Sequence, residues 1–178
     1  MKKNILLPLI TAMLLPFFMR AEWIPLDKQN TLPTPPNVTL ISDDNNSTVL
    51  KIEISGFEIN DLISGDNHYQ MIDLLSESFT TNPGFPELPY IAKVLAIPDQ
   101  AGISVEVLET GEIQYFNNIY LPPARASWLE GSPETSYTEN ADAYNSMSAY
   151  PGEFVQLDPP SIFRDFRITR VSVFPLRY

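Results

Sequence analysis

Prolines exclude helices from a critical stretch of this chain. The sequence holds 17 prolines in 178 residues, and Pro83, Pro86 and Pro89 fall within the single stretch NPGFPELP. Each proline fixes φ near −65° and removes a backbone N–H donor, so no helix forms here. An apolar run over residues 91–97 follows directly. We therefore interpret the proline stretch as an extended lead-in to a β-strand, lying along a sheet edge where missing donors cost little.

Much of the remaining chain shows the two-residue period of β-strands. In residues 48–57, apolar side chains alternate with polar ones, as in a half-buried strand. Residues 91–97 are apolar on both faces except at Lys93, which is typical of a strand buried on both sides. A short turn separates this run from the alternating residues 103–109, and we expect the two to pair as a hairpin. Further strands are expected at residues 38–41, 69–75, 113–121 and 162–178.

Outside the N-terminus, apolar residues at helical spacing are scarce. Residues 59–63 offer about one helical turn before Gly65. The pattern predicts an all-β fold, an antiparallel two-sheet β-sandwich. Residues 122–150 lack a strand pattern and form one long irregular loop. Such loops are uncommon in compact domains and tend to be functional or disordered. Trp128 in this loop either covers the open end of the sandwich or anchors the loop in another surface.

The N-terminus predicts export. Lys2 and Lys3 precede an apolar run over residues 5–19, and Ala21 offers a small residue for cleavage. This is the pattern of a secretory signal peptide over residues 1–21. A stable membrane anchor is disfavoured, because the run is shorter than the roughly 20 residues that a bilayer requires and contains two prolines.

Composition excludes several classes of function. Removal of Lys2, Lys3 and Arg20 leaves 8 basic against 22 acidic residues, a net charge of −14, which argues against nucleic acid as a partner. The sequence has no cysteine and a single histidine, His68, so it offers neither a thiolate nucleophile nor a multi-histidine metal site. The acidic residues 42–46 lack the glycine and distal glutamate of a calcium loop and are interpreted as a polar turn. We expect no enzyme activity, no cofactor and no metal.

A series of short motifs, in a consistent order, resembles the N-terminal prodomain of gingipain-type cysteine peptidases. The resemblance extends from about residue 48 to residue 178. Its motifs are Gly84-x-Pro86-x-Leu88-Pro89, Ile97-Pro98, Val105-Glu106-Val107, Tyr120-Leu121-x-Pro123-Ala124, Tyr150-Pro151-Gly152-Glu153, Asp158-Pro159, Ile162-x-Arg164-Asp165 and Val173-x-Pro175-Leu176-x-Tyr178.

The resemblance implies a secreted inhibitory prodomain that caps the active site of a downstream cysteine peptidase and assists its folding. The partner is then the catalytic domain, made in the same polypeptide. In the family a long loop places a basic residue in the specificity pocket of the enzyme. The matching position here falls near Leu129 or Glu130, whereas the basic residue of this loop is Arg125. Either Arg125 takes this role, or the partner enzyme has a different preference, which we favour.

The resemblance also implies boundaries. Residues 22–47 form a Pro-, Asn- and Asp-rich approach segment, and residues 48–178 form the prodomain. The family prodomain continues with another strand pair, so this chain resembles one without its C-terminal pair, and we expect an unpaired sheet edge at residues 172–178.

The alternative function is a secreted β-sandwich module for adhesion or glycan binding. It requires a row of exposed aromatic side chains. The candidates are Tyr115, Phe116 and Tyr120, but their spacing on a strand places Phe116 and Tyr120 on the face opposite to Tyr115.

Overall fold

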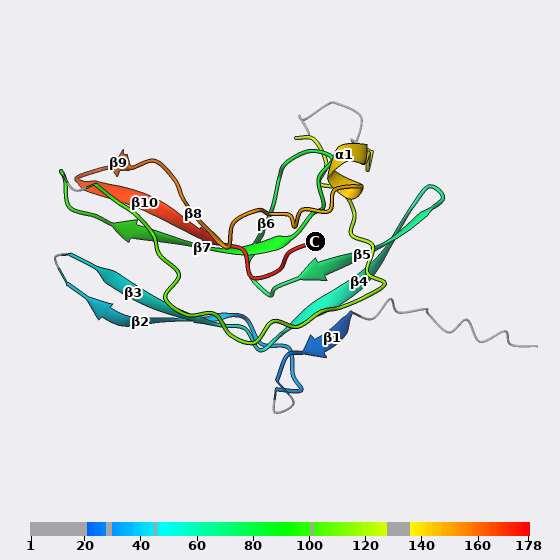
Figure 1. Cartoon of the computed structure of the whole chain (residues 1–178), viewed down its shortest axis with the longest axis horizontal. Coiled ribbons are helices and arrows are strands. Elements are labelled where there is room, and N and C mark those ends of the chain that lie inside the picture. Colours follow the sequence, from blue (N-terminus) through cyan, green and yellow to red (C-terminus); the bar gives the residue numbers. More distant parts are fainter. Residues whose placement is uncertain (1–20, 28–29, 45, 101, 128–135) are drawn as a thin grey trace, which may run out of the picture.

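The chain folds into an antiparallel β-sandwich with a single short helix among the residues that the structure describes (Figure 1). The computed structural model describes residues 21–27, 30–44, 46–100, 102–127 and 136–178. One layer contains β1 (Glu22–Pro25), β2 (Asn37–Asp43), β3 (Thr48–Glu53), β4 (Gly56–Ser64) and β5 (Asn67–Asp73). The other contains β6 (Ser78–Phe79), β7 (Pro89–Ala96), β8 (Val155–Leu157), β9 (Ser161–Phe163) and β10 (Phe166–Val173). The helix α1 spans Ala141–Tyr144.

Three sheets make up the two layers. The first layer consists of a sheet with the strand order β1-β4-β5 and the separate pair β2-β3. The second layer is a sheet with the strand order β6-β7-β10-β8, in which β9 also pairs with β10. Apolar side chains from both layers meet between them and are buried from solvent. This core contains Phe57, Ile72, Leu74, Leu88, Ile91 and Leu121. Burial of such side chains supplies the main stabilisation of a fold that has no cysteine to cross-link it.

The predicted fold class is confirmed, and several strands lie where the sequence pattern placed them. β2 covers the run expected at residues 38–41, β5 covers most of residues 69–75, and β7 covers most of residues 91–97. The run over residues 48–57 is divided between β3 and β4. Gly56 begins β4 where β1 passes so closely that a Cβ atom would lie 2.5 Å from the carbonyl oxygen of Ile24.

The helical turn expected at residues 59–63 is wrong, because these residues lie within β4. Their side chains are partly buried or exposed, and the seven residue pairs from Glu58↔Asp73 to Ser64↔Asn67 join β4 to β5 in one antiparallel ladder. Three apolar residues at helical spacing are a weak signal over a single turn. The ladder with the neighbouring strand satisfies the backbone donors and acceptors instead.

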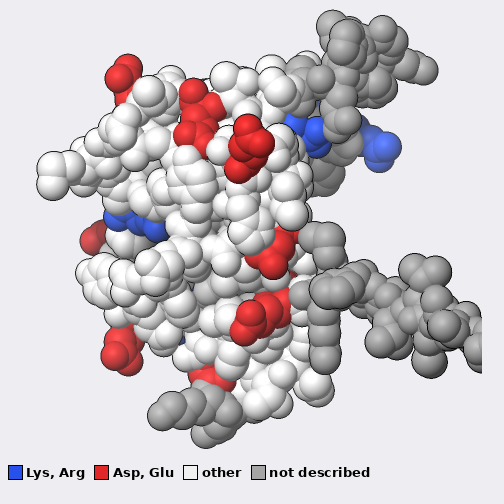
Figure 2. Space-filling model, turned by 90° about the vertical axis from the view of Figure 1, so that its right-hand side faces the viewer, with Lys and Arg blue, Asp and Glu red and all other residues white. Residues whose placement is uncertain are grey.

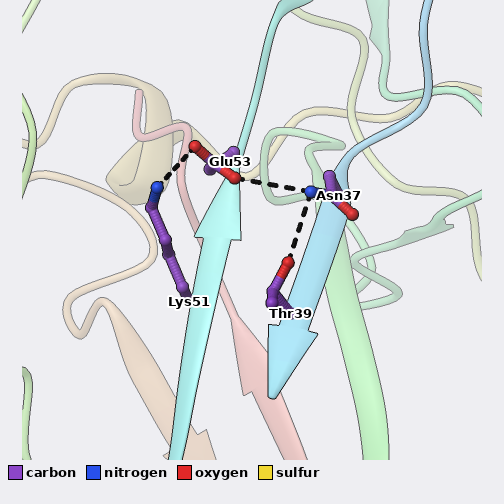
Figure 3. Close-up of polar contacts among 4 residues, drawn as sticks. All are labelled: Asn37, Thr39, Lys51 and Glu53. Carbon is purple, nitrogen blue, oxygen red and sulfur yellow. Dashed lines mark hydrogen bonds and ion pairs between the residues drawn. The ribbon is translucent and has the colours of Figure 1, made fainter. Parts of the chain in front are cut away.

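The β2–β3 pair shows the expected alternation (Figure 3). Lys51 Nζ donates a 2.7 Å hydrogen bond to Glu53 Oε1, and Asn37 Nδ2 donates a 3.4 Å hydrogen bond to Glu53 Oε2. Lys51 thereby lowers the pKa of the Glu53 carboxyl. In the turn that follows β2, Asp44 accepts hydrogen bonds from the backbone N–H groups of Asn46 and Ser47, which confirms the polar turn.

The hairpin expected between β7 and residues 103–109 is wrong. β7 pairs instead with β10, from Ile91↔Val173 to Ala96↔Ile168. Residues 102–121, all of them described, contain no strand, so the strand expected at residues 113–121 is also absent. None of the hydrogen bonds between described residues involves the backbone of residues 102–118. Phe116 and Gln114 hold this segment to the first layer, through an edge-on contact with Phe57 and a hydrogen bond to the carbonyl of Leu26.

The prediction of an unpaired sheet edge at residues 172–178 is wrong as well. Ser172 pairs with Ala92 on one side and with Gln156 on the other, so β10 is a central strand. Tyr178 exchanges two backbone hydrogen bonds with Tyr150, at 2.7 and 2.8 Å. Arg164 and Asp165, expected on a strand, form the turn between β9 and β10, where Arg164 has φ 57°.

The proline stretch is an extended lead-in, but it is buried rather than exposed at an edge. Pro86 and Pro89 are among the fully buried residues, and β7 lies between β6 and β10. The side chain of Thr80 binds this stretch through two hydrogen bonds. Its hydroxyl donates one to the Pro86 carbonyl and accepts one from the Leu88 N–H. The backbone polar groups between the prolines are therefore satisfied inside the protein.

The two layers diverge at the end of the sandwich where β7 ends. An open cavity of about 320 Å³ lies there between the β2–β3 pair and β7. Its lining is chiefly aliphatic and also includes Lys93, Asp43 and Thr48. Among the residues described, no helix is long and apolar enough to span a bilayer.

Limited proteolysis tests the assignment of residues 104–118. All of these residues are exposed, and an extended segment without backbone hydrogen bonds fits a protease cleft. We expect chymotrypsin to cut first within this segment, after Leu108 or Tyr115, and the two fragments to elute together because the β7–β10 ladder joins them. Trypsin is the control, since residues 94–124 contain no Lys or Arg. First cuts inside β7 or β10 would contradict the assignment.

Candidate functional site

One glycine joins both ends of the long loop. Gly84 N–H donates a 2.9 Å hydrogen bond to the Ala124 carbonyl, and the Gly84 carbonyl accepts a 2.9 Å hydrogen bond from the N–H of Asn140. The described residues at the two ends of the loop therefore meet at Gly84. We call the contacts among Gly84, Ala124 and Asn140 the loop clip. It fixes where the loop begins and where it ends.

The first stem of the loop is held along the proline stretch. Glu87 N–H donates to the Pro122 carbonyl at 2.8 Å, and Ala124 N–H donates to the Phe85 carbonyl at 2.7 Å. An antiparallel bridge pairs Pro86 with Pro123, and both prolines are fully buried. Because proline has few accessible backbone conformations, this stem loses little further conformational entropy when the loop forms.

The loop clip requires glycine. Gly84 has φ 82°, in the region that residues with a Cβ rarely adopt. A Cβ atom there would lie 3.1 Å from the Asn140 Cβ and 3.3 Å from the Thr138 carbonyl oxygen. Asn140 also begins α1, since its side-chain oxygen accepts the N–H groups of Asp142 and Ala143. The second stem of the loop, which ends at Asn140, is thus fixed by the hydrogen bond to Gly84 and by the start of α1.

A tyrosine–glutamate cluster packs beside the loop clip. Glu139 Oε1 accepts hydrogen bonds from the hydroxyls of Tyr69 at 2.8 Å and Tyr120 at 2.6 Å. The rings of Tyr69 and Tyr120 stack with centroids 5.3 Å apart. The pKa of Tyr120 is raised chiefly by its hydrogen bond to Glu139, and the pKa of Tyr69 is raised chiefly by burial. Glu139 therefore ties the second stem to β5 of the first layer.

The C-terminal segment extends this cluster. Tyr144, the last residue of α1, donates a 2.9 Å hydrogen bond to the Leu121 carbonyl and packs edge-on against both Tyr120 and Tyr178. Burial raises the pKa of the Tyr144 hydroxyl. Arg177 donates to the carbonyls of Pro151 and Gly152. The end of the loop and the end of the chain thereby form one packed unit.

Arg125 is the one predicted loop residue that the structure places. It is exposed and directly follows the buried stem. Its guanidinium carbon lies 4.9 Å from the ring centre of Tyr137 in the returning half of the loop. Burial raises the pKa of the Glu87 carboxyl, and the positive charge of Arg125 offsets part of this rise. Trp128, Leu129 and Glu130 lie outside the described residues.

The aromatic row needed for a glycan-binding platform does not form from the predicted residues. Phe116 packs on Phe57 and Tyr120 packs on Tyr69, which leaves Tyr115, 84% exposed, without either of them beside it. Within the part of the chain that the structure describes, no three His, Cys, Asp or Glu side chains lie close enough to hold a metal ion.

Sequence reasoning missed the residues that build the base of the loop. The sequence marks Gly84 only as part of a motif and Tyr120 as part of a motif and of the candidate aromatic row, while Tyr69, Glu139 and Asn140 give no signal of their own. The glycine between Pro83 and Phe85 was a usable indication of a positive φ. The contact between Tyr69 and Glu139 joins residues 70 positions apart, which spacing alone does not predict.

The end of the sandwich near α1 carries mostly acidic charge. Figure 2 shows this end, where Asp and Glu are scattered over the surface and Lys and Arg are few. Such a surface favours a partner with basic groups around its binding cleft.

The sequence matches the family model Propeptide_C25 over residues 28–178. The chain belongs to this propeptide family. The match begins earlier than the resemblance read from the motifs and includes β2, which pairs with β3. Membership confirms the gingipain-type propeptide and assigns the chain to a non-catalytic part of such a precursor.

Curated relatives agree with this assignment. The chain is 25% identical over 152 residues to Gingipain R1 of Porphyromonas gingivalis, covering 85% of this chain and 15% of that protein. It is 23% identical over 143 residues to Gingipain R2 of the same species, covering 80% of this chain and 19% of that protein. The chain thus spans less than a fifth of the length of these relatives.

Solved structures share the fold. A complex of the pro- and mature domains of Porphyromonas gingivalis RgpB matches with a TM-score of 0.71 at 22% identity, over 79% of this chain and 74% of that chain. A structure described as an insight into the zymogenic latency of gingipain K from the same species matches with a TM-score of 0.70 at 24% identity, over 89% of this chain and 87% of that chain. The propeptide fold is therefore shared across these proteins.

Substitution of Gly84 tests the loop clip. We expect Gly84→Ala to lower the free energy of unfolding by about 1–3 kcal/mol, because it places a Cβ at a positive φ and against Asn140. Gly111→Ala is the matched control, since nothing lies within 4 Å of an added Cβ there. Urea denaturation measures both. Equal stabilities for the two variants would show that the clip does not constrain the fold.

Alkaline unfolding tests the tyrosine–glutamate cluster. A tyrosine with a raised pKa stays protonated in the folded chain while it ionises in the unfolded chain, so stability holds below about pH 10 and falls above it. Tyr120→Phe removes one such group and should flatten this fall, at a cost of about 1 kcal/mol near neutral pH. Tyr115→Phe, at an exposed position, should leave the profile unchanged. Denaturant midpoints between pH 8 and 11 provide the measurement, and identical slopes for both variants would refute the assignment.

Proposed function

We propose that this chain is a secreted inhibitory prodomain that sterically caps the active site of a cysteine peptidase and assists its folding. The observation that carries the proposal is the loop clip, which holds both ends of the loop on the sandwich. A loop that is already fixed loses less conformational freedom on binding, so more of its contact energy appears as affinity. Membership of a propeptide family supports the same role.

The proposed partner is the catalytic domain of the same precursor. Two solved structures that share this fold are described as a complex of pro- and mature domains and as a study of zymogenic latency. We propose export through a signal peptide at residues 1–21, cleaved after Ala21, with residues 22–47 as the approach segment and residues 48–178 as the capping domain. The net charge of −14 after cleavage suits a partner with a basic rim.

The proposed contact is the loop at residues 122–150, with Arg125, Trp128, Leu129 and Glu130 as the residues nearest the cleft. Arg125 lies over Tyr137 and near the Glu87 charge, at the base of the loop. The following residues 126–139 contain no Lys or Arg. We therefore propose that the partner has a preference other than for basic residues, and that Arg125 positions the loop instead of filling the specificity pocket.

Inhibition in trans tests this function. The purified domain, mixed near 1:1 with the catalytic domain of its precursor, should abolish turnover of a peptide substrate. Gly84→Ala should raise the inhibition constant about tenfold by loosening the loop, while Gly111→Ala should leave it unchanged. Undiminished turnover with the unaltered domain would refute the capping function. A peptidase that cleaves only after Arg or Lys would refute the proposed preference alone.

A further inference from the structure

The strand β7 carries its one charged residue, Lys93, on the face that points toward the other layer. Ile91 lies in the core between the layers, and strand alternation places Lys93 and Leu95 on that same inner face, where both line the interlayer cavity. Lys93 Nζ lies 3.3 Å from Glu77 Oε1. A strand with one solvated face normally places charge outward and apolar groups inward. β7 instead points its one charge inward.

The outer face of β7 and β10 carries exposed apolar side chains at the end near the β9–β10 hairpin. Cross-strand pairing sets Ala96 opposite Ile168 and Phe163 opposite Phe166, and directly opposed residues share a face. Val94, Phe163 and Phe166 are 61%, 59% and 63% exposed. We call these residues the outer patch: Val94, Phe163, Phe166 and Ile168. Nothing in the described part of the chain covers its two phenylalanines or Val94.

Cations border the outer patch in a chain that is strongly acidic overall. Arg170 lies opposite Val94 and pairs with Asp158 at 2.8 Å. The guanidinium carbon of Arg164 lies 5.5 Å from the ring centre of Phe163. Exposed aromatic groups bordered by arginine are typical of protein-binding surfaces. The matching partner surface is apolar at its centre and carries carboxylates at its margin.

The position of the outer patch indicates which partner covers it. β7 begins directly after the proline stretch that anchors the loop and ends beside the β9–β10 hairpin, so its eight residues separate the two features by about 26 Å. Figure 1 shows α1 and the β9–β10 hairpin on the same side of the second layer, at opposite ends. Even a 100-residue domain, with a radius of gyration of about 13 Å, is wide enough to reach both.

We propose that the outer patch is a second docking surface for the peptidase catalytic domain, separate from the loop. This inference rests on the proposed function. The loop blocks the cleft, and the outer patch supplies apolar contact area that holds the catalytic domain over the sandwich. Docking there buries the exposed Val94 on the outer face of β7.

A charge placed on each face of the second layer tests the proposal. Val94→Glu introduces a carboxylate at the centre of the outer patch, and Ile162→Glu introduces the same group on the opposite face of the β9–β10 hairpin, at a residue that is 71% exposed. We expect Val94→Glu to weaken binding to the catalytic domain at least tenfold and Ile162→Glu to change it less than twofold. Surface plasmon resonance gives the affinity, and thermal melting confirms that both variants fold.

The outcomes separate this inference from the proposed function. If the unaltered domain inhibits and Val94→Glu binds as tightly, the outer patch is not a docking surface, while the capping function stands. If the unaltered domain neither binds nor inhibits, both proposals fail. If the unaltered domain dimerises in sedimentation velocity and Val94→Glu is monomeric with unchanged affinity for the catalytic domain, the patch joins two copies of this chain instead. Phe166→Ser provides a second variant in case Val94→Glu does not fold.

Discussion

The backbone at Gly84 constrains the geometry of the whole candidate site. Its N–H and carbonyl groups bind the two stems of the loop, and its positive φ turns the chain so that both groups reach their partners. The buried Pro86, Pro122 and Pro123 fix the first stem, and Asn140 fixes the second while it caps α1. An irregular loop thereby acquires ends as well defined as those of a strand. The steric mechanism depends on this property, because a loop with loose ends would lose much of its binding energy in ordering.

The alternation of apolar and polar residues predicted the positions of several strands well, but it predicted their pairing partners poorly. The positions of β2, β5 and β7 followed from the two-residue period, because side-chain burial on a strand is a local property. Strand partners are not local. β7 joins β10, more than 70 residues away in sequence, instead of residues 103–109 just after it. The same long-range pairing makes β10 a central strand. In the candidate site, the loop and Arg125 were identifiable from the sequence, whereas the cluster of Tyr69, Tyr120 and Glu139 arises only when distant segments meet.

The chain has no cysteine, so disulfides do not cross-link the fold. Buried prolines, stacked tyrosines and a core between two layers take their place. These groups are chemically unreactive, which suits the proposed role of occupying space. The apolar outer face of β7 is the feature that an isolated sandwich does not explain. A docked catalytic domain accounts for it together with the fixed loop.

Amide hydrogen exchange at the loop clip tests the central claim most directly. A domain with a fixed loop base should protect the N–H groups of Gly84, Ala124 and Asn140 nearly as strongly as those shared between β7 and β10, because each is hydrogen-bonded in a packed region. The exposed segment at residues 104–118 supplies an internal reference for fast exchange. Exchange at Gly84 and Asn140 as fast as in that segment would show that the loop has no rigid base, and the steric account would fail.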